Sequence, residues 1–96
     1  MIIEGFIWLP DIIDKLEGKH AVRISEAESV FTEFPVFNRI QRGHVEGEDL
    51  FRALGQTDSG RYLTVFFIYK KTREVLVISA RDMMEKERRQ YAKRKR

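Results

Sequence analysis

The segment RYLTVFFIYKKTREVLVISAR, residues 61–81, decides how this chain folds. Both alternating sets of side chains in its first half are apolar: Tyr62, Phe66 and Ile68 form one set, and Leu63, Val65 and Phe67 form the other. A strand that is apolar on both sides is typical of the centre of a sheet with both faces covered. The polar sequence KKTR then predicts a tight turn, so that residues 74–80 return as an antiparallel neighbour.

A second hairpin is predicted immediately upstream. Residues 49–57, DLFRALGQT, form another strand-like run, and TDSG at 57–60 joins it to the central strand as a turn. Residues 35–40, PVFNRI, predict a further strand whose proline is tolerated at its start or on a sheet edge. The polar residues 41–49 predict a loop.

The N-terminal third predicts one short strand and two helices. Residues 2–8 read as the strand. Pro10 suits the first turn of a helix that continues to Lys19. Ser25 and Glu28 have the spacing of a capping box, which predicts a second helix over residues 25–31.

A third helix is predicted at the other end of the chain. Asp82, with Glu85 three residues later, predicts a cap for a helix that ends near Tyr91, followed by a frayed basic tail over residues 92–96. The predicted fold is therefore a single α+β domain over residues 1–96. It combines an antiparallel sheet of four to five strands with two N-terminal helices and one C-terminal helix.

Composition excludes several classes of protein. Ninety-six residues suffice for one small domain, and 43% hydrophobic residues suffice for one core. The absence of cysteine excludes disulfides, thiolate metal sites and cysteine nucleophiles, and is consistent with the reducing cytoplasm. No apolar run reaches the roughly 20 residues of a membrane helix, and the acidic start does not resemble a signal peptide. We therefore expect a cytoplasmic protein without a membrane partner.

The charge is unevenly distributed. Residues 81–96 contain eight Lys or Arg and three Asp or Glu, whereas the chain as a whole has a net charge of +3. Residues 1–80 are therefore slightly acidic. A basic C-terminal segment indicates phosphate or an acidic partner, or else a solvated tail.

Motifs for metal and cofactor chemistry are missing from the sequence. It contains no phosphate-binding glycine loop, dinucleotide fingerprint, paired-histidine zinc helix or nucleophile elbow. The loop HVEGE, residues 44–48, is the one place where a histidine and carboxylates lie close together. We expect neither a metal nor a cofactor, and a metal-dependent enzyme built around His44 ranks last among the hypotheses.

Three basic positions are candidates for phosphate chemistry. Lys19 and His20 end the first helix. They either take part in RNA cleavage, as a phosphate-binding lysine and a general base, or cap the C-terminus of the helix. Arg52 shares a strand face with apolar neighbours, so it requires a carboxylate or a phosphate as partner. Arg81 ends its strand at the rim of the sheet. Metal-free RNA cleavage mainly requires positioning and positive charge near the phosphorane, which such residues supply.

The last helix has a narrow apolar stripe. Met84, Arg88 and Tyr91 share one side of it, and Met84 and Tyr91 are expected to anchor it. We expect Glu87 and Arg88 to lie on the solvent-exposed surface of this helix. Arg89 and Lys93 are expected to face solvent or to bind nucleic acid weakly.

The order of several short motifs resembles the BrnT-type toxins of bacterial type II toxin–antitoxin systems, which share a general resemblance to the RelE ribonuclease fold. The matching fragments are Phe6-x-Trp8-x-Pro10, Lys19-His20, Val30-Phe31, Gly47-Glu48, Arg52 to Gly55, Gly60 to Leu63, Ile78 to Arg81 and Glu87-Arg88-Arg89-x-Tyr91. Leu9 and Ala21 depart from the family's pattern, which places an aspartate and a glycine at these positions.

The resemblance implies an endoribonuclease toxin that inhibits translation without a metal. Carried over by position, the catalytic residues would be Lys19, His20, Glu48, Arg52 and Arg81, with His20 or Glu48 transferring the proton. Further RNA-binding residues would be Arg88, Arg89 and Lys93. The alternative is a non-catalytic module of the same fold that binds an antitoxin or nucleic acid.

The resemblance also implies particular partners. These would be an RNA substrate and a BrnA-like antitoxin of ribbon-helix-helix type. Operator DNA would be bound only through the toxin–antitoxin complex, in which the chain would form oligomers.

Overall fold

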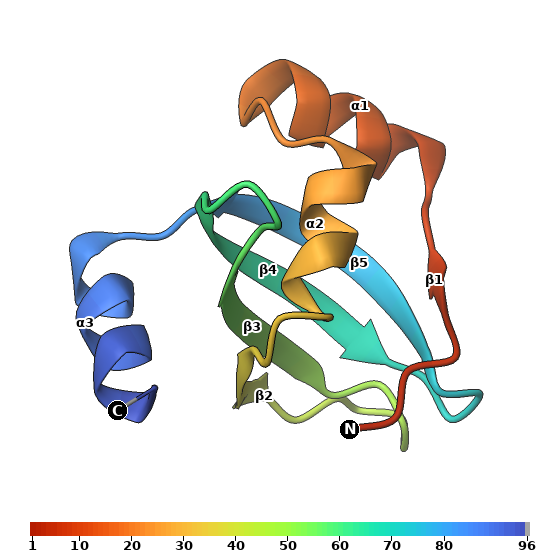
Figure 1. Ribbon diagram of the computed structural model, residues 1–96. Helices are drawn as coiled ribbons and strands as arrows, with labels where there is room; N and C mark the ends of the chain where they lie inside the picture. The colour runs from red at the N-terminus through yellow and green to blue at the C-terminus, as the bar shows by residue number, and fades with distance from the viewer. Residues whose placement is uncertain (96) are drawn as a thin grey trace.

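Five strands form one sheet, and three helices pack against it (Figure 1). The computed structural model describes residues 1–95. The strands are β1 (Gly5–Ile7), β2 (Val36–Gln41), β3 (Leu50–Gln56), β4 (Tyr62–Tyr69) and β5 (Glu74–Asp82), and the helices are α1 (Pro10–Lys19), α2 (Ile24–Val30) and α3 (Glu85–Arg94). The sheet order is β1-β5-β4-β3-β2, so β4 is the central strand, as its two apolar faces predict.

The pairing of the strands confirms both predicted hairpins. β3 pairs antiparallel with β4, β4 with β5, and β2 with β3. β1 differs from the prediction because it pairs parallel with β5, which makes the sheet mixed. Since β1 reaches only residues 74–76, the second half of β5 lies at an edge of the sheet.

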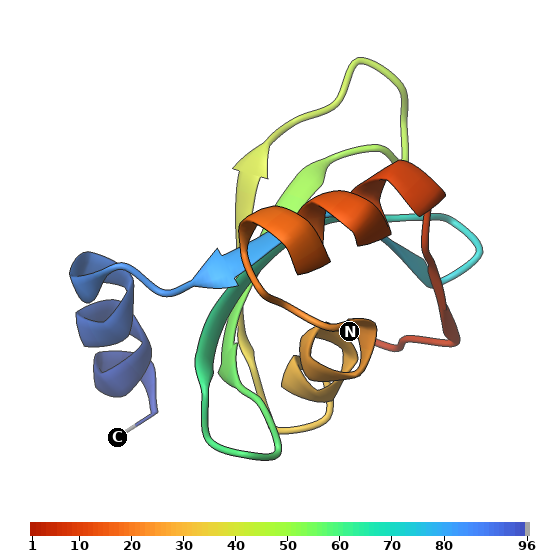
Figure 2. The same cartoon turned by 90° about the horizontal axis from the view of Figure 1, so that it is seen from above.

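The main core lies between the sheet and the first two helices. Figure 2 shows α1 and α2 on one side of the sheet and α3 on the other. Leu63, Val65 and Phe67 point from β4 into this core and are fully buried. The Phe67 ring lies edge-on to the ring of Phe31, with the two centroids 5.1 Å apart. Aromatic packing of this kind joins the helical layer to the centre of the sheet.

The second face of the sheet is covered at one end only. Met83 and Tyr91 pack there on Val36 and Leu54, and Tyr62 completes this smaller cluster. Further along β4, on the same face, Phe66 and Ile68 are half-buried. No helix formed by residues 1–95 covers that part, so β4 carries a closed face and a partly open one.

The second helix has its N-cap two residues earlier than the capping pattern of its sequence predicts. Arg23, not Ser25, is the N-cap of α2, and Glu26 accepts a hydrogen bond of 3.0 Å from the Arg23 backbone N–H. Glu28 does not form the predicted capping box with Ser25, because it accepts a hydrogen bond of 2.7 Å from Nε1 of Trp8. The tertiary contact of Glu28 with Trp8 therefore favours the capping pair Arg23 and Glu26 over the pair Ser25 and Glu28.

The last helix also starts and ends later than predicted. Asp82 is not its cap, because β5 extends to Asp82 and the N-cap is Met84. The buried methionine is Met83, whereas Met84 is 60% exposed, so the predicted anchor was wrong for Met84 and confirmed for Tyr91. α3 continues to Arg94, so residues 92–94 are helical and not frayed. The final residue of the predicted tail, residue 96, lies outside the described part of the chain.

The close approach of α2 to β3 requires glycine at position 55. A Cβ added at Gly55 would lie 2.9 Å from Cγ1 of Val30 and 3.3 Å from its carbonyl oxygen. We expect Gly55→Ala to lower the free energy of unfolding by about 1–3 kcal/mol, measured by urea denaturation. The matched control is Gly18→Ala in α1, which has no neighbour within 4 Å and should be neutral or stabilising. Equal stability of the two variants would contradict this account of the packing.

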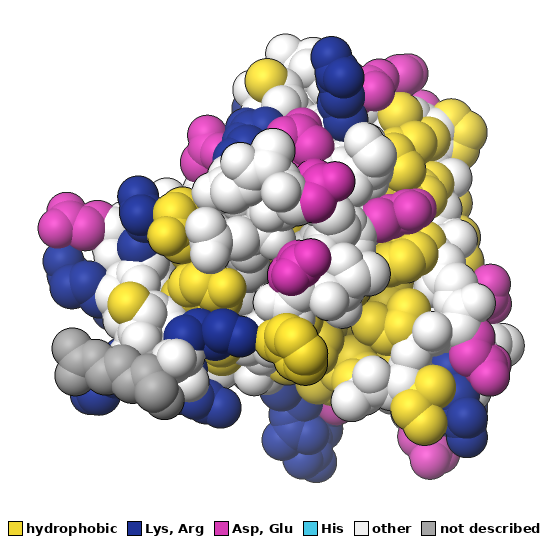
Figure 3. Space-filling model, in the orientation of Figure 1, with side chains coloured by type: hydrophobic (Ala, Val, Ile, Leu, Met, Phe, Trp, Pro, Cys, Tyr) yellow, Lys and Arg dark blue, Asp and Glu magenta, His cyan; other side chains and the backbone are white. Residues whose placement is uncertain are grey.

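Charge is segregated between the helices. Figure 3 shows acidic side chains over α2 and basic side chains around α3. This agrees with the basic character of residues 81–96 in the sequence. None of the described helices is long and apolar enough to cross a membrane.

Candidate active site

A buried carboxylate, Glu87 of α3, is the centre of a polar cluster on the second face of the sheet. Its side chain is 8% exposed. Arg81 donates two parallel hydrogen bonds to it, from Nη1 at 2.7 Å and from Nη2 at 2.9 Å. The Thr64 hydroxyl and the Met84 backbone N–H each donate one more at 2.8 Å. A carboxylate with this many donors is held in one position.

The surroundings of Glu87 keep it ionised. Burial alone would raise the pKa of Glu87, but the hydrogen bonds from Arg81, Met84 and Thr64 outweigh burial and lower the pKa to about 2. The same contact raises the pKa of Arg81 against the opposing effect of burial. Glu87 is therefore a fixed negative charge and a poor proton acceptor, because a general base works best with a pKa near the working pH.

Arg52 completes the cluster from β3. Its Nη1 lies 3.6 Å from the Glu87 carboxylate, and its Nη2 donates to Oδ1 of Asn38 at 2.8 Å and to Oε1 of Gln90 at 3.0 Å. Among the buried side-chain nitrogens and oxygens of residues 1–95, only Nε of Arg52 has no hydrogen-bond partner. A buried donor without an acceptor costs about 1–3 kcal/mol. This nitrogen is enclosed, so a ligand can reach Arg52 only through the exposed part of its guanidinium group, whose side chain is 18% exposed.

The strand register places the two arginines next to each other across β4. Arg81 is opposite Thr64, and Arg52 is opposite Phe66 two residues further along the same face. The Arg81 guanidinium carbon lies 5.4 Å from the centre of the Phe66 ring. Two guanidinium groups around one carboxylate leave a net charge of +1 beside an aromatic ring on a partly open face.

Lys19 and His20 lie at the same end of the sheet but belong to the opposite layer. They end α1, which packs on the core face. Arg61 fixes this end of α1, because it donates to the His20 carbonyl at 3.2 Å and to the Asp82 carboxylate at 2.8 Å. In the part of the chain that the structure describes, no hydrogen bond or ion pair joins Lys19 or His20 to Arg81.

Glu48 lies at the other end of the second face. It lines a small cavity beneath the loop of residues 42–49, together with Leu50, which is two residues before Arg52. The five residues predicted to be catalytic are thus divided among three places: Arg52 and Arg81 in the cluster, Lys19 and His20 at the end of α1, and Glu48 in the cavity.

The three predicted RNA-binding residues lie on the exposed sides of α3. The guanidinium of Arg88 stacks 3.8 Å above the centre of the Tyr62 ring. Arg89 forms an ion pair of 3.0 Å with Glu85, one turn earlier, and Lys93 is exposed. Only Arg88 has a contact that fixes its orientation toward the sheet.

Four members of the cluster were missed by the sequence analysis: Asn38, Thr64, Glu87 and Gln90. Glu87 was predicted to be a solvated surface residue. One signal was present in the sequence, because Arg52 on an apolar strand face requires a carboxylate or a phosphate as partner. That signal named no position, since a helix that starts at Asp82 and one that starts at Glu85 turn different residues toward the sheet.

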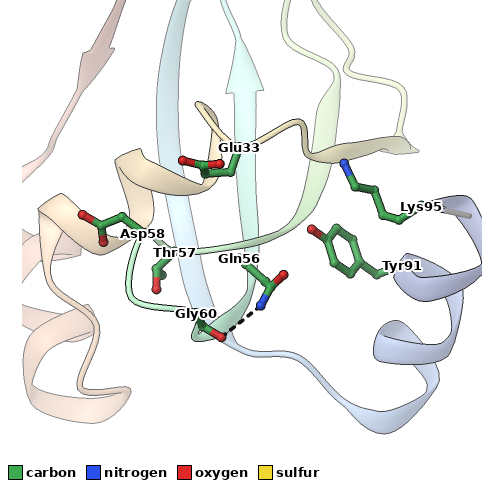
Figure 4. A pocket seen from close by; sticks show the side chains of 7 residues that line it. All are labelled: Glu33, Gln56, Thr57, Asp58, Gly60, Tyr91 and Lys95. Carbon is green, nitrogen blue, oxygen red and sulfur yellow. Dashed lines mark hydrogen bonds between the residues drawn. The ribbon is translucent and has the colours of Figure 1, made fainter.

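A separate hollow lies between the end of α3 and the turn after β3 (Figure 4). Glu33 and Asp58 line it opposite Lys95, and the Gln56 side chain donates to the Gly60 carbonyl at 3.2 Å. Its side chains contribute more negative than positive charge, so it does not suit a phosphate. Within residues 1–95 no group of three or more His, Cys, Asp or Glu side chains could hold a metal ion, the loop of residues 44–48 included.

Comparison with known proteins identifies the family. Residues 9–87 match the family model described as "Ribonuclease toxin, BrnT, of type II toxin-antitoxin system". The crystal structure of the Brucella abortus ribonuclease toxin BrnT is similar in fold, with a TM-score of 0.59 and 16% sequence identity over 84% of this chain and 97% of that one. No protein with a curated description matches the chain. The family match covers most of the chain and includes every predicted catalytic residue. The chain therefore belongs to the BrnT family of toxins of type II toxin–antitoxin systems.

Proposed function

We propose that this chain is a metal-independent endoribonuclease toxin that inhibits translation by cleaving RNA in the cytoplasm. The observation that carries the proposal is the cluster on the second sheet face, where Arg52 and Arg81 surround Glu87 with a surplus positive charge. Both guanidinium groups are partly exposed, with 18% of the Arg52 side chain and 28% of the Arg81 side chain accessible to a phosphate. The family to which the chain belongs supports the same activity.

In the proposed reaction, the two arginines bind the scissile phosphate. A guanidinium group has five N–H donors, and their contacts with Glu87, Asn38 and Gln90 leave some of the donors of Arg52 and Arg81 for phosphate oxygens. When the ribose 2′-oxygen attacks the adjacent phosphorus, negative charge increases on these oxygens. Donors held in fixed positions stabilise that charge without reorganising. Glu87 acts as a positioning residue, because it fixes both guanidinium groups.

We assign proton transfer to His20, with Lys19 beside it as an electrostatic aid. Glu87 is unsuitable because its pKa is about 2 and its oxygens are occupied by donors. His20 is half-buried and is held by Arg61 next to Asp82, the residue that follows Arg81. A general base must lie within hydrogen-bond reach of the proton that it removes, so His20 acts only if the scissile bond lies beside Arg81, at the edge of β5 that β1 leaves free.

The proposed partners follow from the family. A toxin of a type II system acts together with an antitoxin, and we propose a BrnA-like antitoxin of ribbon-helix-helix type for this chain. Operator DNA would be bound only through the complex, in which the toxin would form oligomers.

Chelation tests the metal-free reaction directly. We expect the purified chain to cleave single-stranded RNA at the same rate with and without about 5 mM EDTA, which removes Mg²⁺ and Zn²⁺. Cationic side chains should supply the charge that a metal ion supplies in metal-dependent nucleases. Product lengths and rates are read from end-labelled RNA on a denaturing gel. Loss of cleavage in EDTA would contradict the mechanism. Salt-dependent RNA binding without cleavage in either condition would favour the non-catalytic module instead.

A further inference from the structure

We propose that the cavity beneath the loop of residues 42–49 binds a guanine base of the RNA, next to the phosphate that Arg52 and Arg81 hold. This inference rests on the proposed function and adds the recognition of one particular nucleotide. The cavity has a volume of about 240 Å³, below the roughly 300 Å³ at which cavities for drug-sized ligands begin. It is therefore of a size for one base and not for a folded partner.

The floor of the cavity is apolar and comes from three neighbouring strands. Leu50 of β3 is paired with Ile68 of β4, and Ile78 of β5 completes the floor. Ile78 follows Leu76, the partner of Ile68, on this face, and the register shift between Phe66 and Phe67 brings Ser79 and Arg81 to the same face. A β-bulge of this kind redirects a side chain, and such bulges are frequent beside active sites. The flat ring of a base stacks favourably on an apolar floor.

The rim of the cavity presents charged groups of both signs. Arg42, His44 and Glu48 line it from the loop. Arginine pairs with the O6 and N7 acceptors of guanine, whereas a carboxylate accepts from amino and imino groups of base edges. Guanine presents both kinds of group at once, with O6 and N7 on one edge and N1–H and the 2-amino group beside them. The other three bases match Arg42 and Glu48 less completely.

Contacts within the loop hold the rim in place. The carboxylate of Asp49 accepts a hydrogen bond of 2.8 Å from the backbone N–H of Gly43 and one of 3.5 Å from Arg39. The backbone at Gly43 passes so close to the Glu48 carbonyl that no side chain fits between them. The backbone N–H of Glu48 also donates to the Val45 carbonyl at 3.1 Å. These contacts fix the backbone from which Arg42 and Glu48 extend, which lowers the entropy cost of ordering the loop when a base binds.

The register connects the cavity with the phosphate site. The pair Leu50–Ile68 follows the pair Arg52–Phe66 directly on the same face. Residues two apart on a strand are separated by about 6.8 Å, so the base in the cavity belongs to a nucleotide adjacent to the bound phosphate. A strand of RNA along β4 would thus meet Arg81, then Arg52 and Phe66, and then the cavity. Glu48 becomes a recognition residue in this arrangement and does not transfer the proton.

The test uses Glu48→Gln, which keeps the size of the side chain and removes the carboxylate. The substrates are short single-stranded oligoribonucleotides that differ only in the base next to the cleaved bond. We expect the wild-type chain to prefer guanine in kcat/KM by about 10- to 100-fold. The variant should lose that preference through KM, so that the four substrates are cleaved with similar kcat/KM, whereas a role in chemistry would lower kcat on all four. The matched control is Glu46→Gln in the same loop, since Glu46 is highly exposed and lies outside the cavity.

Each other outcome has a definite meaning. Cleavage without base preference, or a preference that Glu48→Gln retains, overturns the base site and leaves the proposed ribonuclease intact. Equal loss of cleavage on all four substrates assigns Glu48 to the chemistry and also overturns the base site. If the wild type does not cleave RNA, its binding affinity for the same oligonucleotides is measured instead. A preference for guanine in binding that Glu48→Gln abolishes would support the base site, although the ribonuclease proposal fails. Weakened binding of a BrnA-like antitoxin with unchanged RNA recognition would show that the cavity receives protein, which overturns it.

Discussion

RNA cleavage by the Arg52→Ala variant is expected to be about 100- to 1000-fold slower than cleavage by the wild-type chain, the usual effect of removing one fixed donor from a developing oxyanion. Arg52 contributes an unpartnered buried Nε and a guanidinium whose side chain is 18% exposed. Its loss removes one of the two cations from the proposed phosphate site. The rate is measured as single-turnover cleavage of end-labelled RNA, and growth arrest in cells that express the variant is the second measurement.

Arg52 is the better of the two arginines to remove. Without it, Glu87 keeps both hydrogen bonds from Arg81 as well as those from Thr64 and Met84, so the fold should survive. Removing Arg81 instead would leave a buried carboxylate without its bidentate partner, which is strongly destabilising. For Arg81 the informative variant is Arg81→Lys, because lysine keeps the charge but cannot form two parallel hydrogen bonds.

The control for Arg52→Ala is Arg23→Ala, which removes the same charge from an exposed position before α2 on the other face of the sheet. We expect this control to cleave RNA at the wild-type rate. If Arg52→Ala is folded by circular dichroism and still cleaves RNA as fast as Arg23→Ala, the cluster is not the phosphate site.

Glu87→Ala is expected to lower the free energy of unfolding by about 3 kcal/mol. The substitution removes the acceptor of Arg81, the ion-pair partner of Arg52 and the group that holds the start of α3. Partial exposure of both guanidinium groups lets water compensate for some of the loss. The measurement is urea denaturation at neutral pH.

The same contribution depends on pH in a defined direction. The pKa of Glu87 is about 2 in the folded chain, below its ordinary value of 4.5. Its contribution to stability is therefore fully present above about pH 5 and is lost as the pH falls toward 2. The difference in unfolding free energy between the wild type and Glu87→Gln should shrink over that interval.

The matched control for the acid series is Glu85→Gln. Glu85 is in the same helix and forms an ion pair with Arg89, but its side chain is 86% exposed. An exposed pair of this kind contributes little, so Glu85→Gln should follow the wild type at every pH. A difference for Glu87→Gln that stays constant from pH 7 to pH 3 would contradict the ionised, hydrogen-bonded state of Glu87.

The parts of the fold that depend on local pattern were predictable from the sequence. Two apolar faces over residues 62–68 indicated the central strand, and two polar turns indicated the hairpins beside it. Pro10 marked the start of α1 at the correct residue. The parallel pairing of β1 was not predictable in this way, because the partner of an edge strand is set by how the chain crosses over the sheet and not by its own alternation.

Of the residues in the cluster around Glu87, only the two arginines were named from the sequence. Arg52 was named because a charged side chain on an apolar strand face requires a partner, and Arg81 was named because it ends its strand at the rim of the sheet. The partner itself, Glu87, lies 35 residues from Arg52 and six from Arg81, a separation that no local spacing rule relates. Lys19 and His20 stay predictions, and their position in the layer opposite the cluster depends on the packing of α1.

The sequence by itself determined the order of the elements, the centre of the sheet and the surplus of positive charge near the C-terminus, because alternation, turn residues and net charge are local properties. The tertiary structure alone decided which residues of α3 face the sheet. β5 extends to Asp82, where Arg61 binds its carboxylate, and this moves the start of the helix to Glu85. The N-cap moves by two residues, from Asp82 to Met84, and a shift of two residues turns an α-helix by about 200°. Glu87 thereby contacts both arginines. Its side chain, which the sequence predicted to be solvent-exposed, becomes the buried centre of the site.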